Sequence, residues 1–352
     1  MFPLRDIDQL HRWGVWGRCF RWVLLLAALV GVMAAGLPQA QAAAPGQTGQ
    51  VRTVVPLGQA VGIKLFADGV LVVSTSETDP CPARDCGIRE GDLIVSCNGE
   101  KVTSTEDLQA LLQATGGQPA AIGLRREGKT LNVTAAPVQG EDGSWRLGAW
   151  TRDSMAGVGT LTFYDPDTGA YGALGHGITD TDTAQLMPLA SGSIMETSVK
   201  AVKKGEKGEP GQLKGDFTAQ HDVGTVSANT TGGIFGTVAE GDFVSGTALP
   251  VAQRSQVTTG PATILSTVSG DDTRAYQVEI VRLCPMNRDG RDLLLKVTDP
   301  QLLETTGGIV QGMSGSPIIQ NGRFVGAVTH VLVNDPSQGY GILLEHMLEA
   351  VG

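Results

Sequence analysis

The sequence reads GGIVQGMSGSPIIQNGRFVGAVTH from Gly307 to His330, and the rest of the chain is organised around this stretch. Its centre, Gly312 to Pro317, is a loop of small residues between the apolar runs Ile309 to Val310 and Ile318 to Ile319, and a further strand is expected at Phe324 to Val328. A serine hydroxyl attacks a carbonyl only if a base takes its proton and N–H groups hold the resulting oxyanion. Glycines suit such a loop, because a backbone without Cβ atoms can approach the substrate closely. The stretch therefore predicts the nucleophile loop of a serine hydrolase between β-strands.

Two resemblances sharpen this prediction. The hexapeptide Gly312 to Pro317 resembles the Gly-Asp-Ser-Gly-Gly-Pro loop of trypsin-like serine peptidases. The longer string TDPQLLETTGGIVQGMSGSPIIQNGRFVGAVTHVLVNDPSQGYGI, Thr298 to Ile342, resembles the stage IV sporulation protein B peptidases of endospore-forming bacteria, as does GALGHGITD, Gly172 to Asp180. The resemblance implies a multi-domain, mainly β fold. A PDZ-like α+β module would precede a trypsin-like peptidase domain of two six-stranded β-barrels, with the active site between them.

Composition excludes several classes of function. The 352 residues are enough for two ordinary domains, and 48 glycines indicate many turns and short strands. A net charge of −10 offers no electrostatic footprint for nucleic acid. The five cysteines lack paired metal-ligand spacing, so we expect no zinc site and no disulfide framework, although Cys81 and Cys86 could pair in an oxidising compartment. Reduced thiols are the favoured interpretation, and we expect no metal or organic cofactor.

The amino terminus predicts export. Residues 1–22 form a basic leader, residues 23–37 are an uncharged apolar segment, and residues 38–50 have the composition of a linker. Positive charge ahead of an apolar segment keeps the amino terminus in the cytoplasm and sends the rest of the chain across the membrane. Ala40-Gln41-Ala42 resembles a signal-peptidase site, so a cleaved signal and a retained membrane anchor remain open as alternatives.

Residues 51–138 are expected to form the PDZ-like domain. A helix is predicted at Ser104 to Thr115, where Ser104 caps the first turn and two glycines end the helix. The expected strands are Val51 to Val55, Val61 to Phe66, Val70 to Thr75, Leu93 to Cys97, Ala120 to Arg125 and Thr130 to Ala135.

The resemblance to PDZ domains implies a peptide-binding groove. An extended peptide would add to the Val61 to Phe66 strand beside the helix, and a loop would receive its terminal carboxylate. The residues expected for that loop are Gly58, Val61, Gly62 and Ile63. The alternative is a module that packs against the peptidase as a spacer or clamp.

Residues 145–352 are expected to form the peptidase domain, which must supply a base for the serine. His176 lies in Gly175-His176-Gly177 after a strand-like run, and the resemblance makes it the catalytic histidine; His330 is the second choice. The other histidines, His11, His221 and His346, lie before the apolar segment, in a turn and in an expected terminal helix. Lys200 to Asp216 mixes charge with glycine and proline, which predicts an exposed loop.

The carboxylate that orients the histidine is assigned through the sporulation peptidase family, which matches at Asp299. Trypsin-like enzymes carry this residue midway between histidine and serine, where Asp216, Asp222 and Asp242 lie without a recognisable motif. Asp180 and Asp182 are alternates, and Asp299 could also be a turn residue, since Asp-Pro commonly begins turns.

These residues define an expected mechanism. His176 takes the proton of Ser314, Asp299 fixes the imidazole tautomer, and the N–H groups of Gly312 and Ser314 hold the oxyanion. Ser316 is the rival nucleophile, but it lies two residues past the attacking serine of the related loop.

The resemblance implies a serine endopeptidase of sporulation signalling in the space between the forespore and mother-cell membranes. It would cleave the exported part of a membrane-bound regulator, and itself between residues 39 and 50, so that intramembrane proteolysis releases a late sigma factor. Two alternatives remain: a general envelope quality-control peptidase, and a PDZ adaptor without catalytic activity.

Overall fold

The computed structural model describes residues 52–239, 243–284 and 290–350. The basic leader, the apolar segment at 23–37 and the linker lie outside these ranges, as does Asp242. Within them, no helix is both long enough and apolar enough to cross a membrane. The chain divides into two units, Met1–Gln50 and Val51–Gly352, and the description below concerns the second.

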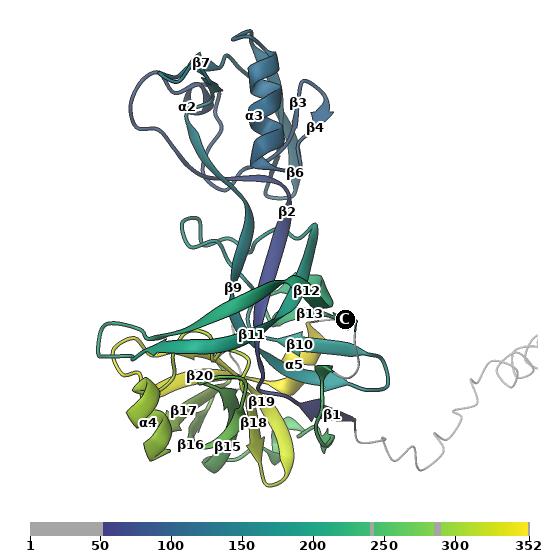
Figure 1. Cartoon of the computed structure of the whole chain (residues 1–352), viewed down its shortest axis with the longest axis vertical. Helices are drawn as coiled ribbons and strands as arrows, with labels where there is room; N and C mark the ends of the chain where they lie inside the picture. The colour runs from purple at the N-terminus through teal and green to yellow at the C-terminus, as the bar shows by residue number, and fades with distance from the viewer. Residues whose placement is uncertain (1–51, 240–242, 285–289, 351–352) are drawn as a thin grey trace, which may run out of the picture. The chain divides into compact units, whose positions relative to one another are not determined.

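A first ring of six antiparallel strands forms one barrel (Figure 1). In order of pairing the strands are β2 (Ala60–Thr75), β9 (Ala149–Asp165), β10 (Ala170–Ala173), β13 (Gly233–Val238), β12 (Gln212–Thr230) and β11 (Ser191–Lys203). The ring closes because β11 pairs with β2. Alternate residues of β2, Val61, Ile63 and Leu65, fill its core, as expected for a strand whose side chains alternate between faces. The strands β1 (Thr53–Pro56) and β14 (Leu249–Pro250) extend this sheet from β9.

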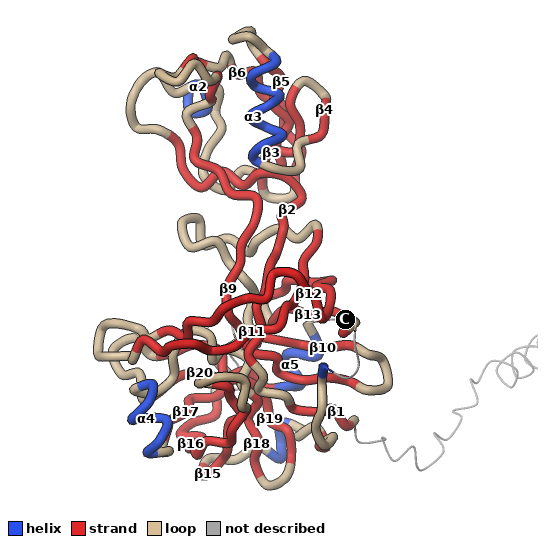
Figure 2. The backbone as a smooth tube through the Cα atoms, viewed as in Figure 1, coloured by secondary structure: helices blue, strands red, loops and turns tan. Residues whose placement is uncertain are grey.

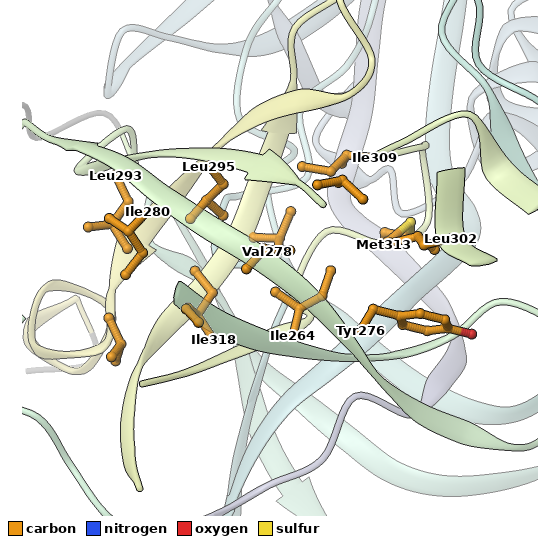
Figure 3. Close-up of a cluster of buried hydrophobic side chains, with 14 of the residues drawn as sticks. Ile264, Tyr276, Val278, Ile280, Leu293, Leu295, Leu302, Ile309, Met313 and Ile318 are labelled. Atoms are coloured by element: carbon orange, nitrogen blue, oxygen red, sulfur yellow. The ribbon is translucent and has the colours of Figure 1, made fainter. Parts of the chain in front are cut away.

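The second barrel is also closed by six strands. These are β15 (Gly260–Thr267), β16 (Thr273–Leu283), β17 (Leu293–Val297), β20 (Gln338–Leu343), β19 (Arg323–Val331) and β18 (Pro317–Gln320). Figure 3 shows its apolar core, to which β16 contributes Tyr276, Val278 and Ile280 at every second position. Three short helices accompany it: η2 (Arg254–Gln256), α4 (Pro300–Thr306) and α5 (Leu344–Glu349). The predicted double barrel is therefore confirmed.

A separate apolar cluster joins the two barrels. Phe163 of β9 and Phe235 of β13 are buried with Phe324 of β19, Ile342 of β20 and Met347 of α5. Burial of large apolar side chains stabilises a fold by roughly 1.5–3 kcal/mol for each residue. This cluster therefore holds the two barrels against each other, which matters because each barrel supplies part of the site described below.

The PDZ-like module has its own apolar core. Figure 2 shows its longer helix beside several strands. Its elements are the end of β2, α2 (Pro82–Asp85), β3 (Leu93–Cys97), β4 (Glu100–Lys101), α3 (Thr105–Ala114), β5 (Ala120–Arg126) and β6 (Lys129–Ala135), followed by the pair β7 (Val138–Gln139) and β8 (Trp145–Arg146). Ser104 caps α3 and forms a capping box with Asp107, as predicted. Cys81 and Cys86 are free cysteines in this structure.

The expected peptide groove requires a correction. Residues Ala60 to Phe66 pair with β9 along one edge and with β11 along the other, so no edge is left for a peptide. The N–H group of Gly58 donates to the carbonyl of Leu161, and the side chains of Val61 and Ile63 are buried in the first barrel. The four residues assigned to a carboxylate loop, Gly58, Val61, Gly62 and Ile63, thus belong to the first barrel and the segment that leads into it.

A hollow beside α3 is bounded by different residues. This pocket of about 450 Å³ lies between Leu108 and Leu112 of α3 and the segment Arg146 to Thr151. Residues Ala149 to Arg152 at the start of β9 pair with Thr75 to Leu71 of β2. The strand beside the helix is therefore the beginning of β9, which lies far from Val61 in the sequence.

Two further predictions differ from the structure. Most of Lys200 to Asp216, predicted as a loop, belongs to the paired strands β11 and β12, and only residues 204–211 connect them. Ile309 and Val310 are not in a strand, although both are buried in the core of the second barrel.

Candidate active site

Ser314 and His176 line the same pocket, whose volume is about 470 Å³. Ser314 lies in the turn before β18 of the second barrel, and His176 follows β10 of the first. Gly312, Thr329 and His330 also line the pocket. Two of the predicted site residues, which are far apart in the sequence, therefore meet where the barrels adjoin.

The turn that carries Ser314 is anchored on both sides of the serine. Met313 is 0% exposed and packs in the apolar core of the second barrel, where Figure 3 labels it near Leu302 and Tyr276. Gly315 has φ +99°, and a Cβ atom there would lie 2.2 Å from the carbonyl oxygen of Thr160. With its neighbours held in this way, the half-buried Ser314 faces the pocket.

Two peptide N–H groups beside the serine are oriented by their carbonyls. The carbonyl of Gln311 accepts from the N–H of Leu213 (2.8 Å), and the carbonyl of Met313 accepts from the N–H of Ser316 (3.0 Å). A trans peptide is planar, so the N–H groups of Gly312 and Ser314 point away from these partners. No acceptor for either N–H group occurs among the described residues. The turn can therefore offer two donors to an oxyanion.

His176 follows a tight turn of left-handed backbone. Leu174 has φ +69° and Gly175 has φ +70°, and such a conformation is unusual for leucine. The imidazole Nδ1 lies 2.9 Å from the carbonyl oxygen of Gly177. A carbonyl can only accept a hydrogen bond, so Nδ1 carries the proton and Nε2 is left as the basic nitrogen. Burial lowers the pKa of His176 below its ordinary value, which keeps the ring neutral.

The serine hydroxyl donates to Thr329 and not to the histidine. Ser314 Oγ lies 2.7 Å from the carbonyl oxygen of Thr329. The pairing of β19 with β20 shifts register between Val328 and His330, and such bulges re-aim backbone groups. The ring of His330 lies beside that of His176, with 5.1 Å between the ring centroids. The hydroxyl of Ser314 is therefore bonded to the backbone of β19 in this structure.

One residue of β9 contacts both loops of the site. The N–H of Thr160 donates to the carbonyl of Ser314 (3.2 Å), and its Oγ1 donates to the carbonyl of Gly312 (2.7 Å). The carbonyl of Thr160 accepts from the N–H of Leu174 (3.2 Å), two residues before His176. Thr160 is 0% exposed, so these hydrogen bonds are shielded from water.

Asp299 lies outside the pocket that contains Ser314 and His176. It is the N-cap of α4, where its carboxylate accepts from the N–H groups of Leu302 (3.0 Å) and Gln277 (3.2 Å). It is not among the described residues that line the pocket of Ser314. The contact between Asp299 and His176 that the family resemblance implied is therefore not formed in this structure. The position of Asp299 at the N-cap of α4 agrees with the alternative interpretation, in which it is a turn residue.

The alternates are also accounted for. Asp180 is buried and pairs with Arg152, which also bonds Asp182 at 3.0 Å, so both carboxylates are directed to that guanidinium. Ser316 is 0% exposed, and its hydroxyl bonds Ser266 at 3.0 Å. Of the two candidate nucleophiles, Ser314 is the one that lines the pocket.

Sequence reasoning missed three features of the site: the bridge at Thr160, the carbonyl of Thr329 and the carbonyl of Gly177. None has a motif, because each acts through backbone groups or through one threonine in a long strand. Within the described ranges there is no group of three or more His, Cys, Asp or Glu side chains that could hold a metal ion.

Gly315→Ala should destabilise the protein more than a matched glycine variant. Its new Cβ would lie 2.2 Å from the carbonyl oxygen of Thr160 and 2.6 Å from the nitrogen of Leu174, so we expect a loss of roughly 3 kcal/mol or more in the free energy of unfolding. Gly322 has φ +71° with nothing within 4 Å, so Gly322→Ala should cost only about 1–2 kcal/mol. Urea titration measures both, and equal losses would contradict the close contact.

Comparison with known proteins gives distant matches over parts of the chain. Regulator of sigma-W protease RasP from Bacillus subtilis (strain 168) is 28% identical over 105 residues, which are 30% of this chain and 22% of that protein. Putative zinc metalloprotease CPE1693 from Clostridium perfringens (strain 13 / Type A) is 30% identical over 67 residues, 19% of this chain and 20% of that protein. The chain thus spans about a fifth of the length of these relatives.

Solved structures show a similarly distant likeness. The active form of the Rv3671c protease from M. tuberculosis aligns with 57% of this chain and 74% of its own, at 14% identity and a TM-score of 0.33. The PDZ domain of the SdrC-like protein Lmo2051 from Listeria monocytogenes aligns with 24% of this chain and 87% of its own, at 23% identity and a TM-score of 0.22.

Family profiles match much longer stretches. A PDZ domain profile matches residues 74–126. The profile described as SpoIVB peptidase S55 matches residues 143–348, which is more than half of the chain and includes Ser314 and His176. The chain therefore belongs to the SpoIVB peptidase S55 family and contains a PDZ domain.

Proposed function

We propose that Ser314 is the nucleophile and His176 the general base of an endopeptidase. One observation carries this proposal: both side chains line one pocket, beside two oriented N–H groups on Gly312 and Ser314. A nucleophile, a base and an oxyanion site in one cleft are the parts that acyl transfer needs.

The chemical steps follow from these positions. Ser314 Oγ turns from the carbonyl of Thr329 and attacks the substrate carbonyl carbon, while Nε2 of His176 takes its proton. The N–H groups of Gly312 and Ser314 stabilise the oxyanion. His176 then gives the proton to the leaving amine as the C–N bond breaks. Water then loses a proton to His176 and attacks the acyl carbon. As the C–Oγ bond breaks, the carboxylic acid leaves and His176 returns the proton to Ser314 Oγ.

The nucleophile and the base are tested by self-cleavage of the full-length chain on a gel. Ser314→Ala and His176→Ala should each abolish cleavage, because one removes the attacking oxygen and the other removes the base. Ser316→Ala is the matched serine control and should keep cleaving, since Ser316 is buried against Ser266. Identical fragments from all four proteins would mean that another protease makes the cut, and the adaptor alternative would then be preferred.

The role that the family resemblance gives to Asp299 stays a prediction, and the same gel tests it. Asparagine caps helices about as well as aspartate but carries no charge, so Asp299→Asn separates the two roles. If Asp299 orients His176 during turnover, Asp299→Asn loses cleavage although α4 stays capped. If Asp299 only caps α4, then Asp299→Asn stays active and Asp299→Ala loses about 1 kcal/mol of stability.

The pKa of His176 predicts how activity depends on pH. Burial lowers this pKa, so the ring stays an uncharged base below pH 6.5, and the acid limb of kcat/KM should have its midpoint below that pH. The unfolded chain binds the proton at the ordinary pKa, so the same shift makes the free energy of unfolding fall as pH drops below about 6.5. A pH–rate profile measures the midpoint, with the exposed His221→Gln variant as control. A midpoint at or above pH 6.5 would contradict a buried base.

We further propose that the peptidase acts in sporulation signalling, in the space between the two membranes around a developing spore. Its substrate would be the exported part of a membrane-bound regulator, and cleavage would trigger intramembrane proteolysis and late sigma-factor activation. Membership of the SpoIVB peptidase S55 family supports this proposal. A general quality-control peptidase is the alternative, and rapid digestion of casein would favour it.

The lining of the pocket favours a substrate with an uncharged apolar side chain beside the scissile bond. Its described walls include Ile178, Ile309, Val310 and Val331, and among the described lining residues none is Asp, Glu, Lys or Arg. An unpaired charge loses its hydration in such a site without gaining a partner.

Internally quenched peptides that differ at one position should show this preference. We expect kcat/KM for leucine or valine to exceed that for lysine or aspartate by at least about tenfold. Val331→Asp should raise the relative cleavage of the lysine peptide, whereas Val281→Asp, on an exposed valine of β16, should not. A preference of the unchanged protein for a charged residue would overturn the proposal.

A further inference from the structure

We propose that the hydroxyl of Thr160 is a positioning group for the oxyanion site, a role outside the triad and its N–H donors. In the described part of the chain, the hydrogen bonds of Thr160 go to backbone groups, and none joins it to Ser314 Oγ or to the imidazole of His176. It acts through Gly312, whose carbonyl accepts from Thr160 Oγ1 at 2.7 Å. The proposal rests on the serine peptidase activity and adds a residue from the first barrel to the nucleophile turn of the second.

The need for such a group follows from the backbone of the turn. Gly312 has φ +99°, a region that glycine can enter and leave with little steric restriction. Its preceding peptide is fixed by the bond between Gln311 and Leu213. Its following peptide carries the carbonyl that Thr160 binds. With both peptides held, the N–H of Gly312 keeps one direction, and an oxyanion site works only when its donors are aimed in advance.

The position of Thr160 also links this turn to the histidine loop. Its N–H donates to the carbonyl of Ser314, and its carbonyl accepts from the N–H of Leu174. These two bonds involve the backbone and survive a change of side chain. A substitution at Thr160 can therefore remove the hydroxyl contact to Gly312 while leaving the strand and the link to His176 in place.

The neighbouring Thr162 provides a matched control. It lies in the same strand, two residues further on, and it is also 0% exposed. Its Oγ1 has no hydrogen-bond partner within the described part of the chain. Threonine and valine have nearly the same shape, so Thr160→Val and Thr162→Val each remove one buried hydroxyl from β9. Only the first change takes a donor away from the active-site turn.

The test uses the full-length chain and two readouts. One is kcat and KM on an internally quenched peptide, and the other is the rate at which a fluorophosphonate probe labels Ser314. Loss of one buried hydrogen bond should lower kcat roughly ten- to hundredfold in Thr160→Val, while KM changes less than about twofold. Probe labelling should slow in parallel, because the phosphonyl oxygen also uses the oxyanion site. Thr160→Ser should restore most of kcat, and Thr162→Val should match the unchanged protein.

The outcomes separate this proposal from the peptidase assignment itself. If Thr160→Val keeps kcat and labelling while Ser314→Ala abolishes both, the peptidase stands and the role of Thr160 is overturned. If Thr160→Val and Thr162→Val lose activity equally, or if the loss follows the unfolded fraction measured by circular dichroism, Thr160 is a packing residue and the proposal fails. If the unchanged protein is neither active nor labelled, the peptidase assignment fails first.

Discussion

The site depends on hydrogen bonds between strand β9 of one barrel and the nucleophile turn of the other. Ser314 and His176 are carried by different barrels, so packing and hydrogen bonds between the barrels must fix their spacing. Catalysis by acyl transfer is sensitive to shifts of an ångström or less between reacting groups. Thr160 bonds the turn at Gly312 and Ser314 and the histidine loop at Leu174, so it relates the two loops directly. The apolar cluster between the barrels then prevents them from sliding apart.

The strands β2 and β9 explain why the sequence alone did not show where the PDZ-like module begins. The strands β2 and β9 each run from the first barrel into the module, and they pair along both parts. Alternating apolar residues predict that Val61 to Phe66 is a strand, and it is one. The pattern cannot say which neighbours it pairs with, because a barrel strand and a groove strand have the same period of two. The segment Val61 to Phe66, which was expected to line the groove, therefore belongs to the first barrel. The start of β9 is the strand that lies beside α3.

The capped helix α3 and several strands were predicted correctly, whereas the contacts of Thr160 and of Asp299 were not. The cap at Ser104 fixed the start of α3, and the strand at Leu93 to Cys97 agrees residue for residue. The nucleophile turn and Gly175-His176-Gly177 were found because glycines mark close approaches of the backbone. Thr160 has no such mark, since a threonine in a strand is ordinary and its role comes from a turn far along the chain. The motif around Asp299 was recognisable, yet its carboxylate is used by the backbone of α4.

The environment of His176 sets a limit on how the base can work. An orienting aspartate does two things for a catalytic histidine: it fixes the tautomer, and its negative charge stabilises the imidazolium that forms when the serine proton is taken. In this structure the carbonyl of Gly177 does the first, because it accepts from Nδ1 at 2.9 Å. The dipole of a carbonyl stabilises the imidazolium much less than the charge of a carboxylate would, and burial further disfavours the charged ring. For His176 as the proposed base, the described arrangement stabilises the imidazolium less than an aspartate at Nδ1 would.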